Sequence, residues 1–200
     1  MPFDNHGRRI ELVRPATPED AEVLSAIYAP FVREAAVTFE LEPPSVAEFA
    51  ERIRDIQAFG AWLVCEIDGA VVGYAYGGRF RARAAYCRTA ETTVYLARGR
   101  ERQGHGRRLY EALKRVLTLQ GFRTLVGGIV LPNDASVRLH EAVGFRPVGV
   151  FHNVGNKFER WRDVGWWELD LGPMPPSAPP PRALSALSAD EIKAACDEDP

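Results

Sequence analysis

The sequence has few cysteines, no long hydrophobic run and almost no net charge. Its three cysteines, Cys65, Cys87 and Cys196, form no CxxC pair and have no histidine-rich partner motif, which argues against a disulfide framework and against a zinc site. A formal charge of −2 provides no general field for nucleic acid or for an anionic membrane. No apolar run reaches the length of a membrane span. We therefore expect no metal, no nucleic-acid partner and no membrane partner.

The N-terminus lacks the features of a secretory signal. It contains Asp4, Asn5 and His6 and no apolar core. The 200 residues are 46% hydrophobic and 26% charged, which suits one compact domain with a core of ordinary size. These features together favour a cytoplasmic protein.

The composition changes near Leu171. Seven of the 15 prolines lie beyond this residue, a density that is typical of an extended linker. Ser188 and Glu191 suggest a capping box for a short acidic helix, but so short a helix is marginal by itself. We expect a globular domain over residues 1–171 and a Pro-rich, disordered and solvated tail over 172–200, in preference to a docking peptide.

Hydrophobic periodicity changes repeatedly between strand and helix in the globular part. Strands are expected where β-branched and aromatic residues gather or alternate with polar ones, and helices where apolar residues recur every three or four positions. The expected elements, in chain order, are a strand over 9–14, helices over 17–34 and 45–56, a hairpin over 62–76, a strand over 91–96, a helix over 107–117, a strand over 125–130, a helix over 134–142, and strands over 145–151 and 166–171. This order predicts an α/β (α+β) fold, a mixed sheet with helices packed on it.

A glycine loop separates the strand that ends at Leu96 from the helix that follows. Gly104 and Gly106 place no Cβ in the way of an anion, and the first amides of the helix point toward it with the positive end of the helix dipole. The loop therefore predicts a pyrophosphate site, although an ordinary turn before an amphipathic helix is the simpler reading of a lone Gly-x-Gly. It is neither a Rossmann fingerprint, because the third glycine is missing, nor a P-loop, because no Gly-Lys-Ser or Gly-Lys-Thr follows.

Several separated motifs resemble one family. The order of elements, the loop Arg102-Gln103-Gly104-His105-Gly106 and the stretch from Asn133 to Phe145 resemble the GCN5-related N-acetyltransferases (GNAT). A narrower resemblance, to phosphinothricin and methionine sulfoximine N-acetyltransferases, rests on Thr38-Phe39-Glu40, Arg81-Ala82-Arg83, Tyr86, residues 89–95, residues 131–134 and residues 161–167. The resemblance covers residues 10–171 and implies the acyl-CoA N-acyltransferase fold, a splayed mixed sheet flanked by helices.

The resemblance implies acetyl-CoA as the donor and no metal. In this family the strand before the loop diverges from its neighbour, so that its backbone can bind the pantetheine while the loop amides hold the pyrophosphate. The residues that match these cofactor positions are Val94, Tyr95, Leu96, Arg102, Gln103, Gly104, His105, Gly106, Arg107 and Asn133. Glu101 stands where relatives carry Gln or Arg, so we expect slightly weaker cofactor binding.

Two residues are candidates for catalysis. An amine must be neutral to attack a thioester, so the site needs a route for its proton. Glu91 matches the acid/base residue of the narrower family, whereas without the resemblance it is a solvated strand carboxylate. His140 matches the family's histidine on the next helix and could act as base or acid, whereas a lone helical histidine is more often structural.

The acceptor side is expected to combine arginine with aromatic residues. Arg81, Arg83, Tyr86 and Phe39 match substrate-binding positions of the narrower family, and a guanidinium suits a carboxylate or a phosphinate. A solvated basic loop is the alternative. Arg81 replaces a common Lys and Arg88 replaces a Trp of some relatives, so acceptor preference is expected to differ.

These residues predict direct transfer of acetyl from acetyl-CoA to the α-amine of phosphinothricin, methionine sulfoximine, methionine sulfone or a similar small amino acid. The alternatives are acetylation of another amine, such as a polyamine or a protein N-terminus, and a non-catalytic CoA-binding regulatory module. The resemblance favours a homodimer, with Trp161, Trp166 and Trp167 as core and dimer-surface aromatics.

Overall fold

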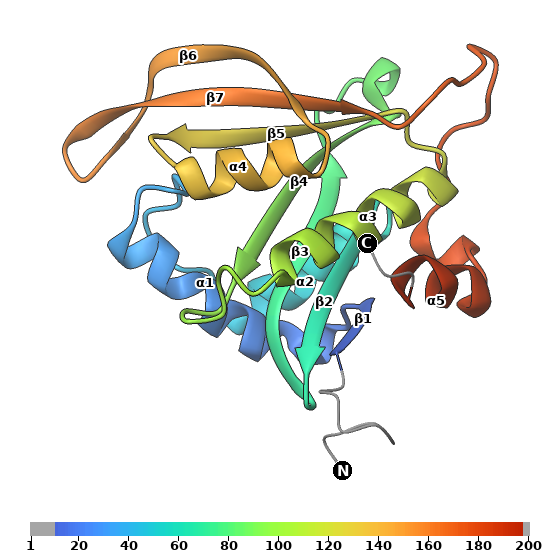
Figure 1. The fold of residues 1–200 in the computed structure, drawn as a ribbon, viewed down its shortest axis with the longest axis horizontal. Helices are drawn as coiled ribbons and strands as arrows, with labels where there is room; N and C mark the ends of the chain where they lie inside the picture. Colours follow the sequence, from blue (N-terminus) through green and yellow to red (C-terminus); the bar gives the residue numbers. More distant parts are fainter. Residues whose placement is uncertain (1–10, 198–200) are drawn as a thin grey trace.

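The computed structural model describes residues 11–197, and within them one mixed sheet of seven strands in the order β1-β2-β3-β4-β5-β7-β6 (Figure 1). The strands are β1 (Glu11–Pro15), β2 (Ala61–Ile67), β3 (Ala70–Arg79), β4 (Thr89–Leu96), β5 (Thr124–Leu131), β6 (Arg146–Lys157) and β7 (Arg160–Asp170). Every neighbouring pair is antiparallel except β4 and β5, which are parallel. The predicted mixed sheet is confirmed, while Arg9 and Ile10 of the first expected strand lie outside the described residues.

Five α-helices cover the two faces of the sheet within the described chain: α1 (Ala21–Glu34), α2 (Val46–Gln57), α3 (His105–Gln120), α4 (Asp134–Ala142) and α5 (Ala189–Asp197). Local capping fixes their ends. Ser45 and Glu48 form a reciprocal capping box at the start of α2, and Gly121 ends α3 in the left-handed conformation with φ 97°. The expected helix start at Thr17 is a 3-10 turn, Pro18–Asp20, that leads into α1. None of the described helices has the length and hydropathy of a bilayer span.

The sheet separates two hydrophobic cores because its strand residues alternate in direction. In β2, Trp62 and Val64 pack with α1 and α2, whereas Leu63 and Cys65 pack with α3. All four side chains are buried. A buried side chain of this size stabilises the fold by about 1.5–3 kcal/mol, so the central strands stabilise both helical layers at once.

The C-terminal segment differs from the expectation of a disordered, solvated tail. A 3-10 turn (Leu184–Ala186) and α5 pack against α3 and β1, and they bury four apolar side chains, Leu184, Leu187, Ala195 and Cys196. The backbone of Arg182 exchanges hydrogen bonds with Gln120 at the end of α3. The expectation was wrong because the prolines dominate the composition, while a few well-spaced apolar residues are enough to attach the segment.

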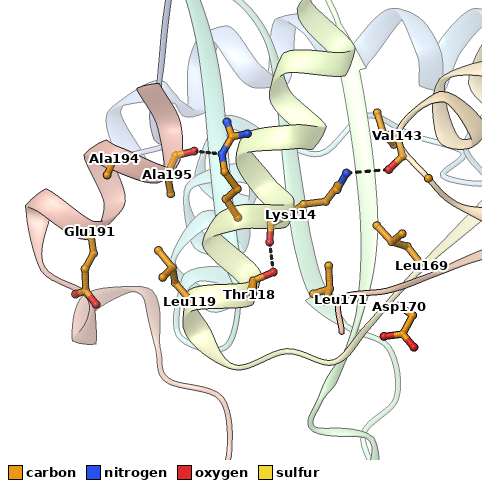
Figure 2. Close-up of a pocket in the computed structure, with 12 residues that line it drawn as sticks. Lys114, Thr118, Leu119, Val143, Leu169, Asp170, Leu171, Glu191, Ala194 and Ala195 are labelled. Carbon is orange, nitrogen blue, oxygen red and sulfur yellow. Dashed lines mark hydrogen bonds between the residues drawn. The ribbon is translucent and has the colours of Figure 1, made fainter. Parts of the chain in front are cut away.

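A cavity of about 720 Å³ lies between the C-terminal half of α3, the end of β7 and α5 (Figure 2). Leu119, Leu169 and Leu171 contribute to its apolar wall, and Lys114 at its edge donates to the carbonyl of Val143 at 2.9 Å. The predicted site residues do not line this cavity, because the glycine loop lies at the opposite end of α3.

Candidate active site

The parallel strands β4 and β5 diverge after a short pairing. Residues 89–91 pair with residues 124–126, and the β4–β5 ladder stops there, although β4 stays paired with β3 as far as Leu96. The β5-facing backbone edge of Val94, Tyr95 and Leu96 is therefore outside any strand ladder. This fork between the two strands is the splay that the family resemblance implied, and it leaves backbone groups available to an extended ligand.

The glycine loop lies between the open edge of β4 and α3. Gly104 is the N-cap of α3 with φ 91°, a left-handed conformation that disfavours a side chain, and the space around it is open. The first intrahelical bond of α3 runs from the amide of Arg108 to the carbonyl of Gly104. The amides of His105, Gly106 and Arg107 therefore lie in the first turn, where no intrahelical acceptor exists, and such a helix terminus is suited to an anion.

Two details of this loop differ from the sequence interpretation. A Cβ on Gly106 would lie 3.2 Å from Leu139, so glycine at this position serves the packing of α3 against α4. Arg102 and Arg107, which match cofactor positions, are exposed, whereas Arg108 points to β1, 3.7 Å from the carboxylate of Glu11. The side chain of Gln103 contacts the loop itself, because its Nε2 donates to the carbonyl of Gly99.

His105 anchors the start of α3 instead of facing solvent. Its Nδ1 lies 2.9 Å from the carboxylate of Glu11, and Cys65 lies beside both groups, with the three possible metal-ligand atoms within 4.8 Å of one another. The guanidinium of Arg108 and the positive end of α3 disfavour a cation here, and burial raises the pKa of the Cys65 thiol to about 12. The cluster is better suited to fixing the loop than to holding a metal.

Glu91 lies at the fork itself, where β4 and β5 separate. It is partly buried, and burial raises the pKa of its carboxyl group, while the positive charge of Arg81 opposes that rise. Among the described residues, no donor is hydrogen-bonded to the Glu91 carboxylate. A carboxylate with a raised pKa and free acceptor sites is suited to accept a proton.

His140 is buried, with 4% of its surface exposed, and both ring nitrogens are hydrogen-bonded. Its Nδ1 donates to the carbonyl of Ser136 at 2.8 Å, and its Nε2 accepts from the hydroxyl of Tyr110, also at 2.8 Å. Burial lowers the pKa of the imidazole, which is therefore neutral near pH 7. A substrate cannot reach Nε2 unless Tyr110 moves, so His140 can exchange protons with the fork only through that hydroxyl.

Glu91 and His140 lie on opposite faces of β4. Thr92, the neighbour of Glu91, points to the α3 side, where its hydroxyl is 3.5 Å from that of Tyr110. Glu91 shares the other face with Tyr95, which packs with α1 and α2. The sequence patterns did not identify Tyr110 as a site residue, because it lies in the apolar stripe of α3. Its hydroxyl was the only feature that could have distinguished it from an ordinary core residue.

Asn133 is the N-cap of α4. Its side-chain oxygen accepts from the amide of Ser136 at 3.1 Å, which leaves the amide nitrogen as the group that can face a ligand. The predicted cofactor contact of Asn133 is therefore restricted to hydrogen-bond donation.

The expected acceptor residues come from two segments, one between β3 and β4 and one between α1 and α2. Arg81 lies over the ring of Phe80 and close enough to Glu91 to lower its pKa, while Tyr86 packs edge-on against Phe80 with ring centres 5.7 Å apart. Arg83 is exposed at the start of the 3-10 turn Ala84–Tyr86. Phe39 lies in the loop between α1 and α2, where its ring packs on Gly155 of β6.

Arg88 does not belong to this group. Its guanidinium donates to the carbonyls of Ala178 and Pro179 and so holds the C-terminal segment. The influence on acceptor preference that the sequence suggested for Arg88 has no direct contact to support it.

The sheet fork, the glycine-capped helix and the half-buried carboxylate of Glu91 are features suited to an extended anionic ligand and to a proton acceptor. The profile of the Acetyltransferase (GNAT) domain matches residues 13–166. The chain therefore belongs to the GNAT acetyltransferase family, as the sequence motifs predicted.

Similar proteins indicate which members of the family this chain resembles. A phosphinothricin N-acetyltransferase of Streptomyces viridochromogenes is 40% identical over 170 residues, which are 84% of this chain and 93% of the relative. An L-methionine sulfoximine/L-methionine sulfone acetyltransferase of Pseudomonas aeruginosa is 31% identical over 80% of this chain and 95% of its own. The crystal structure of a phosphinothricin acetyltransferase from Sinorhizobium meliloti in complex with AcCoA has a TM-score of 0.79 and 32% identity, and covers 85% of this chain and 92% of its own.

Proposed function

We propose that this protein transfers the acetyl group of acetyl-CoA to the α-amine of a small amino acid such as phosphinothricin, methionine sulfoximine or methionine sulfone. The family and the activities named for its relatives support this assignment. The observation that carries it is Glu91, a half-buried carboxylate with a raised pKa at the point where β4 and β5 separate.

The donor fits the fork and the loop. The free backbone edge of residues 94–96 would bind the pantetheine, and the first-turn amides of α3 would hold the pyrophosphate, where glycine at position 104 leaves the approach open. Arg102 and Arg107 add exposed positive charge, and the Asn133 amide nitrogen can donate to the cofactor. When bound, acetyl-CoA supplies a thioester carbonyl that a neutral amine can attack.

Glu91 would make the acceptor amine reactive. An α-amine is mostly protonated at neutral pH, so it must lose a proton before it can act as a nucleophile. Glu91 takes that proton, directly or through one water, and the burial that raises its pKa makes it a stronger base. His140 lies on the opposite face of β4 and its Nε2 accepts from the hydroxyl of Tyr110, so it would take part only indirectly, through that hydroxyl.

The acceptor would be held by charge and by aromatic surface. Arg81 and Arg83 suit the carboxylate or phosphinate of an amino-acid acceptor, and Tyr86 and Phe39 suit its side chain. A polyamine would need acidic groups at the same place, where arginines lie instead.

We also propose a homodimer formed through the β6–β7 hairpin, which extends past the rest of the molecule in Figure 1. The hairpin exposes large apolar side chains, among them Val148 at 60%, Phe151 at 57% and Trp161 at 64% of their surface. Trp161→Glu should yield a monomer in sedimentation experiments.

A dependence on acetyl-CoA supports a cytoplasmic location. We assign the catalytic unit to residues 1–171.

A thiol-release assay with acetyl-CoA tests the reaction against phosphinothricin, methionine sulfoximine, methionine sulfone and a panel of natural amines. We expect turnover of amino acids, with intersecting lines in two-substrate kinetics. Parallel lines would exclude direct transfer. Glu91→Gln should keep acetyl-CoA binding and lower kcat by about 100-fold or more, while Glu51→Gln, exposed on α2, serves as the control. Binding of acetyl-CoA without turnover of any amine would instead indicate a CoA-binding module.

A further inference from the structure

Lys157, the last residue of β6, is a buried cation that the sequence did not single out. Only 2% of its surface is exposed, and its Nζ donates to the carbonyl of Thr38 at 2.9 Å. Among the described residues this carbonyl is its only hydrogen-bond acceptor. Burying an ammonium group is costly, so a lysine at this place needs a compensating role.

Thr38 is a junction of three elements. Its hydroxyl is 2.6 Å from that of Tyr28 in α1 and accepts from the amide of Glu40 in the same loop. Tyr95, in the open part of β4, also contacts this hydroxyl. The bond from Lys157 adds β6 to the junction, so a single carbonyl connects the β6–β7 hairpin with the loop that carries Phe39.

Phe39 is held against the same strand. Its ring lies on Gly155, two residues before Lys157, and a Cβ at position 155 would collide with the ring. Since residues i and i+2 of a strand share a face, Gly155 and Lys157 contact the loop over residues 38–40 from one side. The glycine accommodates the aromatic ring, and the lysine fixes the backbone beside it.

The charges around Lys157 do not neutralise it. Burial lowers the pKa of its ammonium group, and the negative charge of Glu40 opposes that shift, but this carboxylate already pairs with Arg52 at 2.6 Å. Phe158 provides the other contact, with its ring centre 5.2 Å from the ammonium. The lysine thus binds the loop by a charge-assisted bond to a backbone carbonyl, which is stronger than a neutral one.

We infer that Lys157 is a positioning residue for the acceptor: its ammonium fixes the Thr38 carbonyl and thereby places Phe39 over Gly155, at the acceptor side of the fork. This inference rests on the proposed function, in which Phe39 contacts the acceptor. It predicts that acceptor recognition depends on Lys157 while donor binding does not, because its ammonium group contacts Thr38 and Phe158, which belong neither to the fork nor to the glycine loop.

The test compares Lys157→Met with Lys157→Arg and with Lys193→Met, an exposed lysine of α5. For an acceptor that the wild type acetylates, we expect Lys157→Met to lower kcat/KM by about tenfold to a hundredfold, mainly through KM, with the KM for acetyl-CoA unchanged. Lys157→Arg should recover part of the loss, and Lys193→Met should behave as wild type. Gly155→Ala, which displaces Phe39 and keeps the lysine, should reproduce the acceptor defect.

Hydrogen exchange provides a readout that does not need turnover. Amides of residues 35–42 should exchange faster in Lys157→Met than in the wild type, while those of α3 keep their protection. An unchanged acceptor KM with unchanged exchange would overturn the inference. So would an equal loss of both KM values with general loss of protection, which would indicate only a structural lysine. Failure of the proposed function would be distinguishable from failure of this inference, because the wild-type protein would then acetylate no amino acid.

Discussion

Replacing Tyr110 by phenylalanine removes one buried oxygen and keeps the ring that packs in α3. Tyr110 has no exposed surface, and its hydroxyl donates to His140 Nε2 at 2.8 Å. The hydroxyl of Thr92, at 3.5 Å, lies too far away to contribute much. The substitution therefore isolates one hydrogen bond between two buried groups.

The cost follows from what the imidazole loses. A buried acceptor that is left without a donor costs about 1–3 kcal/mol, and the free energy of unfolding should fall by that amount. For a domain of this size each kcal/mol corresponds to about 2–4 °C in Tm. The lost donor also stabilised the neutral imidazole, so the pKa of His140 should rise from its lowered value toward the ordinary one.

Urea unfolding measures the first effect, and imidazole ¹⁵N NMR across a pH titration measures the second. In the wild type, His140 has a lower pKa in the folded than in the unfolded chain, so the unfolded chain binds a proton first as pH falls. The free energy of unfolding therefore decreases as pH falls through the ordinary histidine pKa of about 6.5. In Tyr110→Phe this acid loss should be smaller. A variant of wild-type stability, or one in which the pKa of His140 stays the same or falls, would refute the argument.

Three further predictions concern the base, the C-terminal segment and the loop. Burial raises the pKa of Glu91 and Arg81 lowers it, so kcat/KM should fall on acidification with an apparent pKa above the ordinary 4.5. Arg81→Met should shift this acidic fall of the pH profile to higher pH. An unshifted profile would show that Glu91 is not the group responsible. Leu187→Ala should destabilise the fold by about 2 kcal/mol in urea, whereas Leu41→Ala, 73% exposed, should not; equal effects would contradict the packing of the segment. Gly104→Ala should cost about 1–2 kcal/mol because φ is 91°, and should weaken acetyl-CoA binding in calorimetry; unchanged binding would remove the loop from the donor site.

Features that depend on neighbouring residues could be predicted from the sequence, and features that depend on distant ones could not. The capping box of Ser188 and Glu191, the loop around Gly104 and the order of strands and helices all follow from local spacing in the sequence. The bond between Tyr110 and His140 joins residues 30 positions apart and exists only because α3 packs on α4. Lys157 and Thr38 are 119 positions apart, and no local pattern connects them.

The resemblance supplied candidates for the site but not their arrangement. Glu91 and His140 both matched catalytic positions, yet the alternation of β4 places them on opposite faces of the sheet. The composition led to a wrong prediction at the C-terminus. The prolines there indicated a disordered segment, but Leu184 and Leu187 attach it to the core.

The packing of α5 on β1 brings the first and last described elements of the chain together. Ala195 and Cys196 belong to the same core as Val13, so a protein that emerges from the ribosome cannot complete this core until its final helix is available. Contacts of such long sequence separation form late and slow folding. The same closeness of the two ends makes the chain a candidate for circular permutation, with a short linker joining α5 to β1 and new termini in an exposed loop.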